Sequence, residues 1–142
     1  GVDLSTEMIR EAKLHFPDQE FAAGDFYDLP FEDDTFAGCL AFYCIVHLQP
    51  EQLVNAFAEM RRVLKPNGLL LLAFHIGTEP VHNEDFLDAG AALTFFPFPV
   101  DVVTSALTAA GFKEALARER EPYETEYPSQ RCYVFARKTR TC

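Results

Sequence analysis

Two aspartates, Asp3 and Asp25, are the first residues whose position suggests chemistry, because each stands at the end of a stretch typical of a short β-strand. Asp3 follows Val2, and Asp25 follows Gly24, which allows a sharp turn of the backbone. A carboxylate accepts hydrogen bonds, so Asp25 suits an exocyclic amine of a ligand. In open α/β sheets, ligands bind outside the carboxyl ends of the strands. The sequence therefore predicts a ligand site here, although Gly24 and Asp25 could also form a simple turn.

His47 is the candidate general base, because it follows a second apolar strand that ends at Phe42 and Tyr43. A neutral imidazole accepts a proton near neutral pH. The alternative is a histidine at the entry of a helix with a structural hydrogen bond. Tyr43 has the same two interpretations, since it could contact a ligand or pack in the core.

His75, Glu79 and His82 form a second polar group farther along the chain. Their spacing lacks the i, i+4 pattern with which two histidines of one helix bind a metal ion. We therefore interpret them as solvated loop residues and predict no metal site.

Composition limits the class of protein. The chain has 142 residues, of which 49% are hydrophobic, and this is enough for one domain with a real core. The net charge of -10 would repel a phosphate backbone, so nucleic acid is not expected as a partner. No apolar run is long enough to cross a bilayer, and no secretory signal is recognisable. The cysteines lack metal-ligand spacing, which favours a reducing, cytoplasmic location; they are Cys39, Cys44, Cys132 and Cys142.

Hydrophobic periodicity predicts an α/β arrangement. A helix over residues 6–15 is capped by Ser5 or Thr6 and stopped by Pro17, and a second helix begins at Pro50. The continuous apolar run at 69–74 predicts a parallel strand buried on both faces. Three further elements follow, namely a helix over 101–110 capped by Asp101, and strands over 112–118 and 131–137 that should pair antiparallel at a sheet edge.

Three basic residues, Arg61, Arg62 and Lys65, gather at the end of the second helix. Positive charge there complements the helix dipole. We interpret these side chains as solvated residues and not as a phosphate site.

Residues 75–99 break the pattern of helices and strands. This segment contains Gly, Pro, charged residues and the aromatic residues Phe86, Phe95, Phe96 and Phe98. A long segment that leaves the carboxyl end of a strand often folds over the site. We therefore expect 1–142 to form a single domain in which 75–99 is a lid or acceptor pocket wall.

A series of short motifs resembles a known family. The motifs are VDLS at 2–5, GDF at 24–26, LPF at 29–31 with DDTF at 33–36, VLKPNG at 63–68 and AAGF at 109–112. In this order and spacing the chain resembles the class I S-adenosylmethionine-dependent methyltransferases that act on small molecules. The resemblance covers nearly the whole chain.

This resemblance implies a fold, an activity and a set of site residues. The fold would be an α/β, Rossmann-like three-layer sandwich with a mostly parallel sheet and an antiparallel C-terminal hairpin. The enzyme would transfer a methyl group from S-adenosylmethionine to a small-molecule acceptor, and His47 would deprotonate that acceptor where a base is needed. Asp3 would accept hydrogen bonds from the ribose hydroxyls and Asp25 from the adenine amino group. The other cofactor-binding residues implied are Leu4, Phe26, whose backbone amide would reach a ring nitrogen, and Ala41, Phe42 and Tyr43.

The chain departs from the family in one respect, because the first strand and helix, with their glycine-rich GxGxG loop, are absent before Asp3. In the family that strand lies between the strand of Asp3 and the strand of Leu40. Its loss would leave unpaired backbone groups on both sides. We therefore expect an N-terminally incomplete domain, whose slot is filled by residues upstream of Gly1, by strand exchange or association with another chain, or by rearrangement of the sheet.

Two rival functions remain open at the level of sequence. A nucleotide-binding oxidoreductase would share an acid after the second strand, but motifs GDF and LKPNG do not belong to its fingerprint. A non-catalytic, methyltransferase-like interaction module would retain the fold without binding a methyl donor.

Overall fold

The computed structural model describes residues 1–85, 90 and 92–139, and it arranges their strands in three separate sheets. The largest sheet has the order β3-β4-β8-β7. Its strands are β3 (Phe36–Phe42), β4 (Leu64–His75), β7 (Glu114–Arg120) and β8 (Arg131–Arg137). β3 pairs parallel with β4, whereas β8 is antiparallel to both β4 and β7. The predicted α/β fold and the antiparallel C-terminal hairpin are therefore confirmed.

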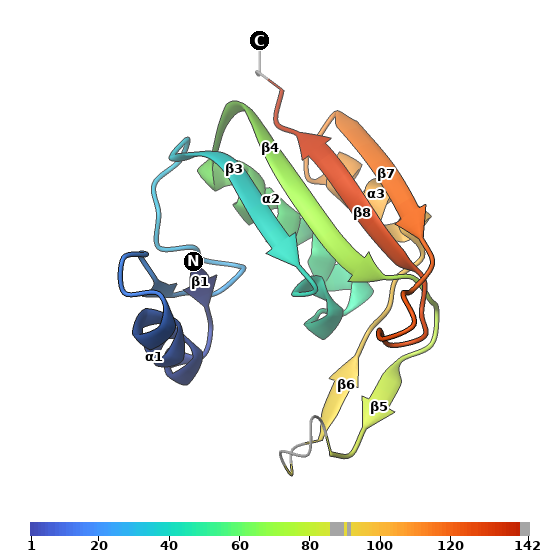
Figure 1. Cartoon of the computed structure of the whole chain (residues 1–142). Helices are drawn as coiled ribbons and strands as arrows, with labels where there is room; N and C mark the ends of the chain where they lie inside the picture. The colour runs from blue at the N-terminus through green and yellow to red at the C-terminus, as the bar shows by residue number, and fades with distance from the viewer. Residues whose placement is uncertain (86–89, 91, 140–142) are drawn as a thin grey trace.

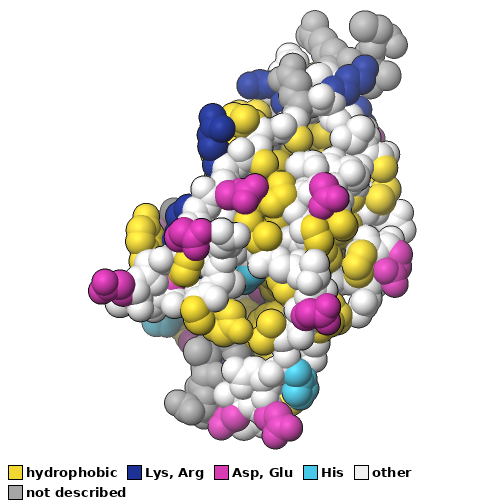
Figure 2. Space-filling model, turned by 90° about the vertical axis from the view of Figure 1, so that its right-hand side faces the viewer, with side chains coloured by type: hydrophobic (Ala, Val, Ile, Leu, Met, Phe, Trp, Pro, Cys, Tyr) yellow, Lys and Arg dark blue, Asp and Glu magenta, His cyan; other side chains and the backbone are white. Residues whose placement is uncertain are grey.

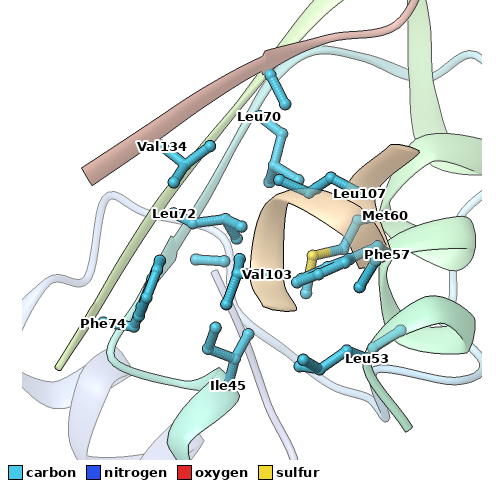
Figure 3. Close-up of a cluster of buried hydrophobic side chains, with 14 of the residues drawn as sticks. Ile45, Leu53, Phe57, Met60, Leu70, Leu72, Phe74, Val103, Leu107 and Val134 are labelled. Carbon is cyan, nitrogen blue, oxygen red and sulfur yellow. The ribbon is translucent and has the colours of Figure 1, made fainter. Parts of the chain in front are cut away.

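Helices α2 (Leu53–Val63) and α3 (Val100–Ala109) cover one face of this sheet (Figure 1). Alternate residues of β4 point toward them, because successive side chains of a strand face opposite sides. Leu70, Leu72 and Phe74 are fully buried there and pack with Phe57 of α2 and Val103 of α3 (Figure 3). We call these four strands and two helices the main body.

The opposite face of the larger sheet is open among the described residues (Figure 1). Its strands expose large apolar side chains, which are Leu40, Phe42, Leu69, Leu116 and Phe135. In Figure 2, which shows the molecule from the right-hand side of Figure 1, hydrophobic side chains gather over the middle of the visible face and acidic side chains surround them. The α/β sandwich therefore has its helical cover over the main body on one side only.

The first residues form a separate small structure, which we call the N-terminal unit (residues 1–25). It consists of β1 (Val2–Asp3), α1 (Thr6–His15) and β2 (Ala22–Ala23), and β1 pairs parallel with β2. The Ser5 side chain accepts a hydrogen bond from the Met8 backbone amide, as the predicted helix cap requires. The apolar face predicted for α1 is buried only at Ile9, because little else covers this helix.

The two sheets do not join. β1 has only β2 as a partner and β3 has only β4, so within the described residues each strand has one open edge. Figure 1 shows β1 and α1 set apart from β3. The predicted gap between the strand of Asp3 and the strand of Leu40 is therefore present.

The region 75–99, expected to be irregular, contains a short hairpin. β5 (Val81–Asn83) pairs antiparallel with β6 (Leu93–Phe95). The chain after β6 is fixed to the main body, since the Phe96 amide donates to the Val46 carbonyl at 2.7 Å and the Phe98 amide to the His75 carbonyl at 3.0 Å. The expectation for Phe86 falls outside the described residues.

Two boundaries differ from the sequence prediction. β7 begins at Glu114 and not at Phe112, because the Phe112 side chain is buried in the core beside α3. The predicted cap of α3 is also wrong, since Pro99 occupies the cap position and Asp101 lies in the first turn. Gly111, which adopts a positive φ of 94°, follows the end of the helix, where glycine is favoured.

No helix among the described residues combines the length and apolar character that crossing a membrane requires.

Candidate functional site

A cavity of about 1370 Å³ lies between the N-terminal unit and β3. Every residue that the sequence singled out for the site contributes to its wall: Asp3, Leu4, Asp25, Phe26, Ala41, Phe42, Tyr43 and His47. The structure thus brings together side chains from three separate stretches of the chain.

Asp3 and Asp25 lie at the same edge of the small sheet, because β1 and β2 are parallel and Asp3 pairs with Ala23 in the register. Each carboxylate is oriented by the backbone two residues ahead. Asp3 Oδ1 accepts from the Ser5 amide at 2.8 Å, and Asp25 Oδ1 accepts from the Tyr27 amide at 3.0 Å. A carboxylate has two acceptor oxygens, so each aspartate keeps capacity for a ligand donor.

Arg62 holds the acidic loop that leads from Asp25 to β3. Its guanidinium donates to the carbonyls of Leu29 at 3.1 Å and Phe31 at 2.8 Å, and to Asp33 Oδ1 at 2.8 Å. It also pairs with Glu59, and this hydrogen bond holds the pKa of that carboxyl below its usual range. The interpretation of Arg62 as a solvated helix-end residue is therefore wrong, because its long side chain reaches across to a loop about 30 residues away in sequence.

The β3 side of the cavity is largely apolar and carries two thiols. Ala41 is buried, and Phe42 is exposed toward the gap. Burial raises the pKa of the Cys39 thiol, and burial also raises the pKa of the Cys44 thiol to about 11. Both thiols are therefore protonated at neutral pH, which disfavours a cysteine nucleophile at this wall.

His47 lies in the short 3₁₀ helix η1 (Ile45–His47) and is exposed. Its ring centroid is 5.7 Å from that of Phe95 in β6, so the histidine connects the cavity wall to the β5–β6 hairpin, whose described residues do not line the cavity themselves. An exposed imidazole at a cavity wall can exchange protons with a bound molecule and with solvent.

Tyr43 adopts a backbone conformation that is rare for a bulky residue. Its φ is 51°, in the left-handed region. Its amide donates to the Ala73 carbonyl at 2.8 Å, and its ring centroid lies 4.9 Å from that of His75. Its hydroxyl oxygen lies 3.5 Å from that of Tyr133.

The interpretation of His75 as a solvated loop residue is wrong. This histidine is the last residue of β4, it is partly buried, and its Nδ1 lies 2.7 Å from Ser129 Oγ. The sequence contained a usable signal, since His75 directly follows the apolar run at 69–74, at the strand's carboxyl end. His82 lies in β5 and pairs with Thr94 Oγ1 at 2.9 Å. Among the described residues no three His, Cys, Asp or Glu side chains form a group that could hold a metal ion.

Comparison with known sequences gives consistent matches. A family model described as a methyltransferase domain matches residues 1–68. The chain is 31% identical over 102 residues to a sterol 24-C-methyltransferase from Gibberella zeae, covering 66% of this chain and 26% of that protein. It is 38% identical over 71 residues to a demethylmenaquinone methyltransferase from Beutenbergia cavernae, covering 50% of this chain and 29% of that protein. The chain thus spans between a quarter and a third of the length of these relatives.

Comparison with solved structures shows the same fold. An S-adenosylmethionine-dependent methyltransferase from Methanosarcina mazei superposes with a TM-score of 0.80 at 19% identity, covering 98% of this chain and 81% of that one. A phosphoethanolamine N-methyltransferase from Haemonchus contortus, solved with S-adenosylmethionine, superposes with a TM-score of 0.74 at 16% identity, covering 99% of this chain and 43% of that one.

Proposed function

We propose that the chain belongs to the class I S-adenosylmethionine-dependent methyltransferases and takes part in methyl transfer from S-adenosylmethionine to a small-molecule acceptor, which the family model and the relatives support. The relatives named above act, by their names, on a sterol and on demethylmenaquinone. Both acceptors are small molecules, which supports the same class of acceptor here.

The observation that carries this proposal is the pair of carboxylates at one end of the cavity. Asp3 and Asp25 leave parallel neighbouring strands at the same edge, and each has one oxygen fixed by the local backbone. Such a pair fits the two kinds of donor that an adenosine presents, the ribose hydroxyls and the adenine amino group. The residues present therefore fit the adenosine end of the donor.

The remaining wall residues take roles that follow from their positions. Leu4 and Phe26 flank the two aspartates and offer apolar contact to the adenosine. We assign to the Phe26 backbone amide a hydrogen bond to an adenine nitrogen. Ala41, Phe42 and Tyr43, at the end of β3, line the path toward the methionine end.

When bound, S-adenosylmethionine supplies a methyl group on a sulfonium, which an acceptor's lone pair attacks as the carbon–sulfur bond breaks. Holding the acceptor in line with that bond provides most of the rate increase. The residues of the cavity wall fix this geometry. We propose that the β5–β6 hairpin, which reaches His47 through Phe95, borders the acceptor side. His47 accepts the proton where the acceptor is a hydroxyl or an amine.

In this proposal, one further strand fills the gap between β1 and β3. Both strands present an open edge, and Val2 and Leu40 expose apolar side chains beside it. Unpaired backbone groups and apolar surface are both unfavourable in a sheet, so a further parallel strand fits the gap. We propose that residues encoded upstream of Gly1 supply it, while a strand from a second molecule is the alternative.

The test begins with donor binding. We expect Asp3→Ala to weaken binding of S-adenosylmethionine more than about tenfold, because charge-assisted hydrogen bonds contribute about 1.5–3 kcal/mol. Glu7→Ala, at an exposed site on α1, serves as the control. Calorimetry would be performed on residues 1–142 and on a longer product that includes the residues encoded upstream of Gly1.

We expect the longer product to bind the donor and residues 1–142 to bind it weakly as a monomer. Equal affinity of the Asp3→Ala variant and the unaltered protein would contradict the assignment of the aspartate. Absence of donor binding in the longer product would instead favour a non-catalytic interaction module.

The role of His47 needs a separate measurement. His47→Asn should lower the rate of methyl transfer and change its pH profile, while leaving donor affinity unchanged. A variant with the rate and pH profile of the unaltered protein would show that this histidine is structural.

A further inference from the structure

A second cluster of polar and aromatic side chains continues from the cavity across the carboxyl ends of β3 and β4. It lies on the open face of the larger sheet, since Ala73 of β4 pairs with both Phe42 of β3 and Tyr133 of β8. Ring centroids of Phe42 and Tyr133 are 6.4 Å apart, and Tyr43 stacks on His75 at 4.9 Å. Phe42 and Tyr43 belong both to this cluster and to the wall of the cavity.

Tyr43 is the residue that joins the two. Its left-handed φ of 51° disfavours a bulky residue, and the other non-glycine residues described with positive φ are Asp34 and Asn67, whose types tolerate it. Such strain persists where the surrounding structure fixes it, and it often marks a functional position. The hydrogen bond from its backbone amide to the Ala73 carbonyl and the ring contact with His75 fix this tyrosine.

The Tyr43 hydroxyl retains hydrogen-bonding capacity. Its distance of 3.5 Å to the Tyr133 oxygen is long for two hydroxyl groups, which normally approach to 2.5–3.0 Å. A phenol has one donor and can accept as well. Arg131 also hydrogen-bonds this hydroxyl, and because an arginine can only donate, the Tyr43 O–H stays available to an oxygen of a ligand.

Tyr133 is held far more firmly. Its oxygen accepts from Arg120 Nε at 3.2 Å and Nη2 at 3.1 Å, and Arg120 in turn makes a bidentate pair with Glu126 at 2.7 and 2.8 Å. Planar guanidinium–carboxylate pairs of this kind fix orientation as well as distance. The chain Glu126–Arg120–Tyr133 thus sets the position of the group that faces Tyr43.

The charged groups beside the cluster are mainly positive. Arg131 is only 4% exposed and donates to the carbonyls of Tyr127 and Ser129, with Glu126 at 3.5 Å. Burial, and then the charge of Arg131, lower the pKa of His75, so this imidazole is neutral at neutral pH. Nearest the cluster, the guanidinium groups of Arg120 and Arg131 share the Glu126 carboxylate, and Glu121 adds a second carboxylate that is exposed to solvent.

We propose that the Tyr43 hydroxyl contacts the methyl acceptor, an inference that rests on the proposed function. Tyr133 and Arg120 are then positioning residues for the Tyr43 hydroxyl. The acceptor is a planar, hydroxyl-bearing molecule that is neutral or anionic. The rings of Phe42, Tyr43 and Tyr133 offer faces and edges to a planar molecule. The two arginines disfavour an ammonium group here, although the chain as a whole has a net charge of -10.

Two small probes test this assignment without knowledge of the natural acceptor. para-Nitrophenol carries a hydroxyl on a planar ring, and para-nitrobenzylamine carries an ammonium group on the same ring. Calorimetric titration of each would use the form of the full chain that binds S-adenosylhomocysteine, saturated with that product. We expect para-nitrophenol to bind at least about fivefold more tightly than para-nitrobenzylamine, because like charges oppose binding of the amine.

Three variants isolate the hydroxyl groups. Tyr43→Phe keeps the ring contact with His75 and should weaken para-nitrophenol about five- to tenfold, the range for one hydrogen bond. Tyr133→Phe should give a smaller loss, because it removes only the positioning group. Tyr123→Phe is the matched control, since this exposed tyrosine touches the same Arg120 through its ring face at 4.3 Å. Tyr133→Phe and Tyr123→Phe should retain the affinity for S-adenosylhomocysteine.

Unchanged para-nitrophenol affinity in Tyr43→Phe, or tighter binding of the amine probe, would overturn the inference while leaving the proposed methyl transfer intact. A larger loss of S-adenosylhomocysteine affinity than of para-nitrophenol affinity in Tyr43→Phe would also overturn it, because the hydroxyl would then serve the donor and not the acceptor. A protein that binds no S-adenosylhomocysteine in any form would refute the proposed function and this inference together.

Discussion

The N-terminal unit and the main body differ sharply in how they are held together. The main body buries Phe57, Phe74 and Phe112 between its sheet and two helices. The N-terminal unit has two-residue strands and one buried large side chain, Ile9, while Met8 and Leu14 are exposed. Yet both proposed adenosine-binding aspartates lie in the N-terminal unit. Recognition chemistry and folding stability are therefore concentrated in different regions of the molecule.

The largest expected effect is a loss of stability, and it tests whether folding stability is concentrated in the main body. Phe57→Ala, in the centre of the core, should destabilise the main body by about 3–5 kcal/mol, because it removes a buried aromatic ring and leaves a cavity. Leu14→Ala in α1, where the side chain is 65% exposed, should change stability by less than about 0.5 kcal/mol. Urea unfolding of both variants would measure the difference, and similar losses would show that the two regions form one cooperative unit.

Cys44 lies at the boundary between the main body and the N-terminal unit, because it lines the cavity from the main-body side. Burial raises the pKa of this thiol from 9.0 to about 11, so the thiolate population falls about a hundredfold. Alkylation by iodoacetamide near neutral pH should be slower by that factor in the folded protein than in urea. Mass spectrometry would measure labelling at this position, with Cys44→Ser to assign the peptide. Rapid labelling would mean that this wall opens frequently.

Substitution of one glycine in each region compares how well the main body and the N-terminal unit tolerate an added methyl group. At Gly68 a Cβ would approach the Lys65 and Ala37 carbonyls to 2.8 and 3.2 Å, and backbone atoms in a sheet cannot yield easily. Gly68→Ala should therefore cost about 1–3 kcal/mol. At Gly24 a Cβ would meet side-chain atoms of Pro30 and Val2 at 2.8 Å and no backbone atom, and the loosely packed N-terminal unit can shift Gly24 and Val2 away from Pro30. Gly24→Ala should cost less than Gly68→Ala in thermal unfolding, and the reverse order would contradict the comparison.

The smallest expected effect is a change in how the stability of the protein falls at acidic pH. Glu126 is held by Arg120, and this hydrogen bond, followed by the Tyr123 amide, lowers the pKa of the carboxyl from 4.5 to about 2. A depressed carboxyl pKa stabilises the folded state above the unfolded value, so this contribution is lost as pH falls from about 4.5 to about 2. Glu126→Gln should flatten the stability profile in that window. Glu124→Gln, at an exposed neighbour, is the control, and identical profiles for the two variants would argue against the Arg120 pair.

Much of the site was accessible from the sequence because its residues stand in local patterns. Asp3 and Asp25 end short apolar stretches, and Ala41, Phe42 and Tyr43 end another. Since parallel strands bring their carboxyl ends to one edge, naming the strand ends was enough to predict which side chains share a cavity. The roles of these side chains remain predictions.

Other features were not accessible because they depend on residues far apart along the chain. Arg62 reaches back to Leu29 and Phe31, and nothing in the helix pattern around it indicates this contact. The hairpin of β5 and β6 also escaped prediction, since its strands are three residues long and lack a clear alternation. Short elements of this kind are defined by their partners more than by their own sequence.

The sequence by itself determined the order of the longer helices and strands, the positions of the acidic strand ends and the family resemblance, because periodicity and motif spacing are properties of neighbouring residues. Only the tertiary structure decided that Tyr43 meets Tyr133 across 90 positions of sequence, and that Arg120 and Glu126 fix this meeting. It also decided that, among the described residues, the sheet does not close up across the predicted gap between β1 and β3. The physical reason is that strand pairing and side-chain hydrogen bonds join segments whose approach is set by packing of the whole domain, which no local pattern encodes.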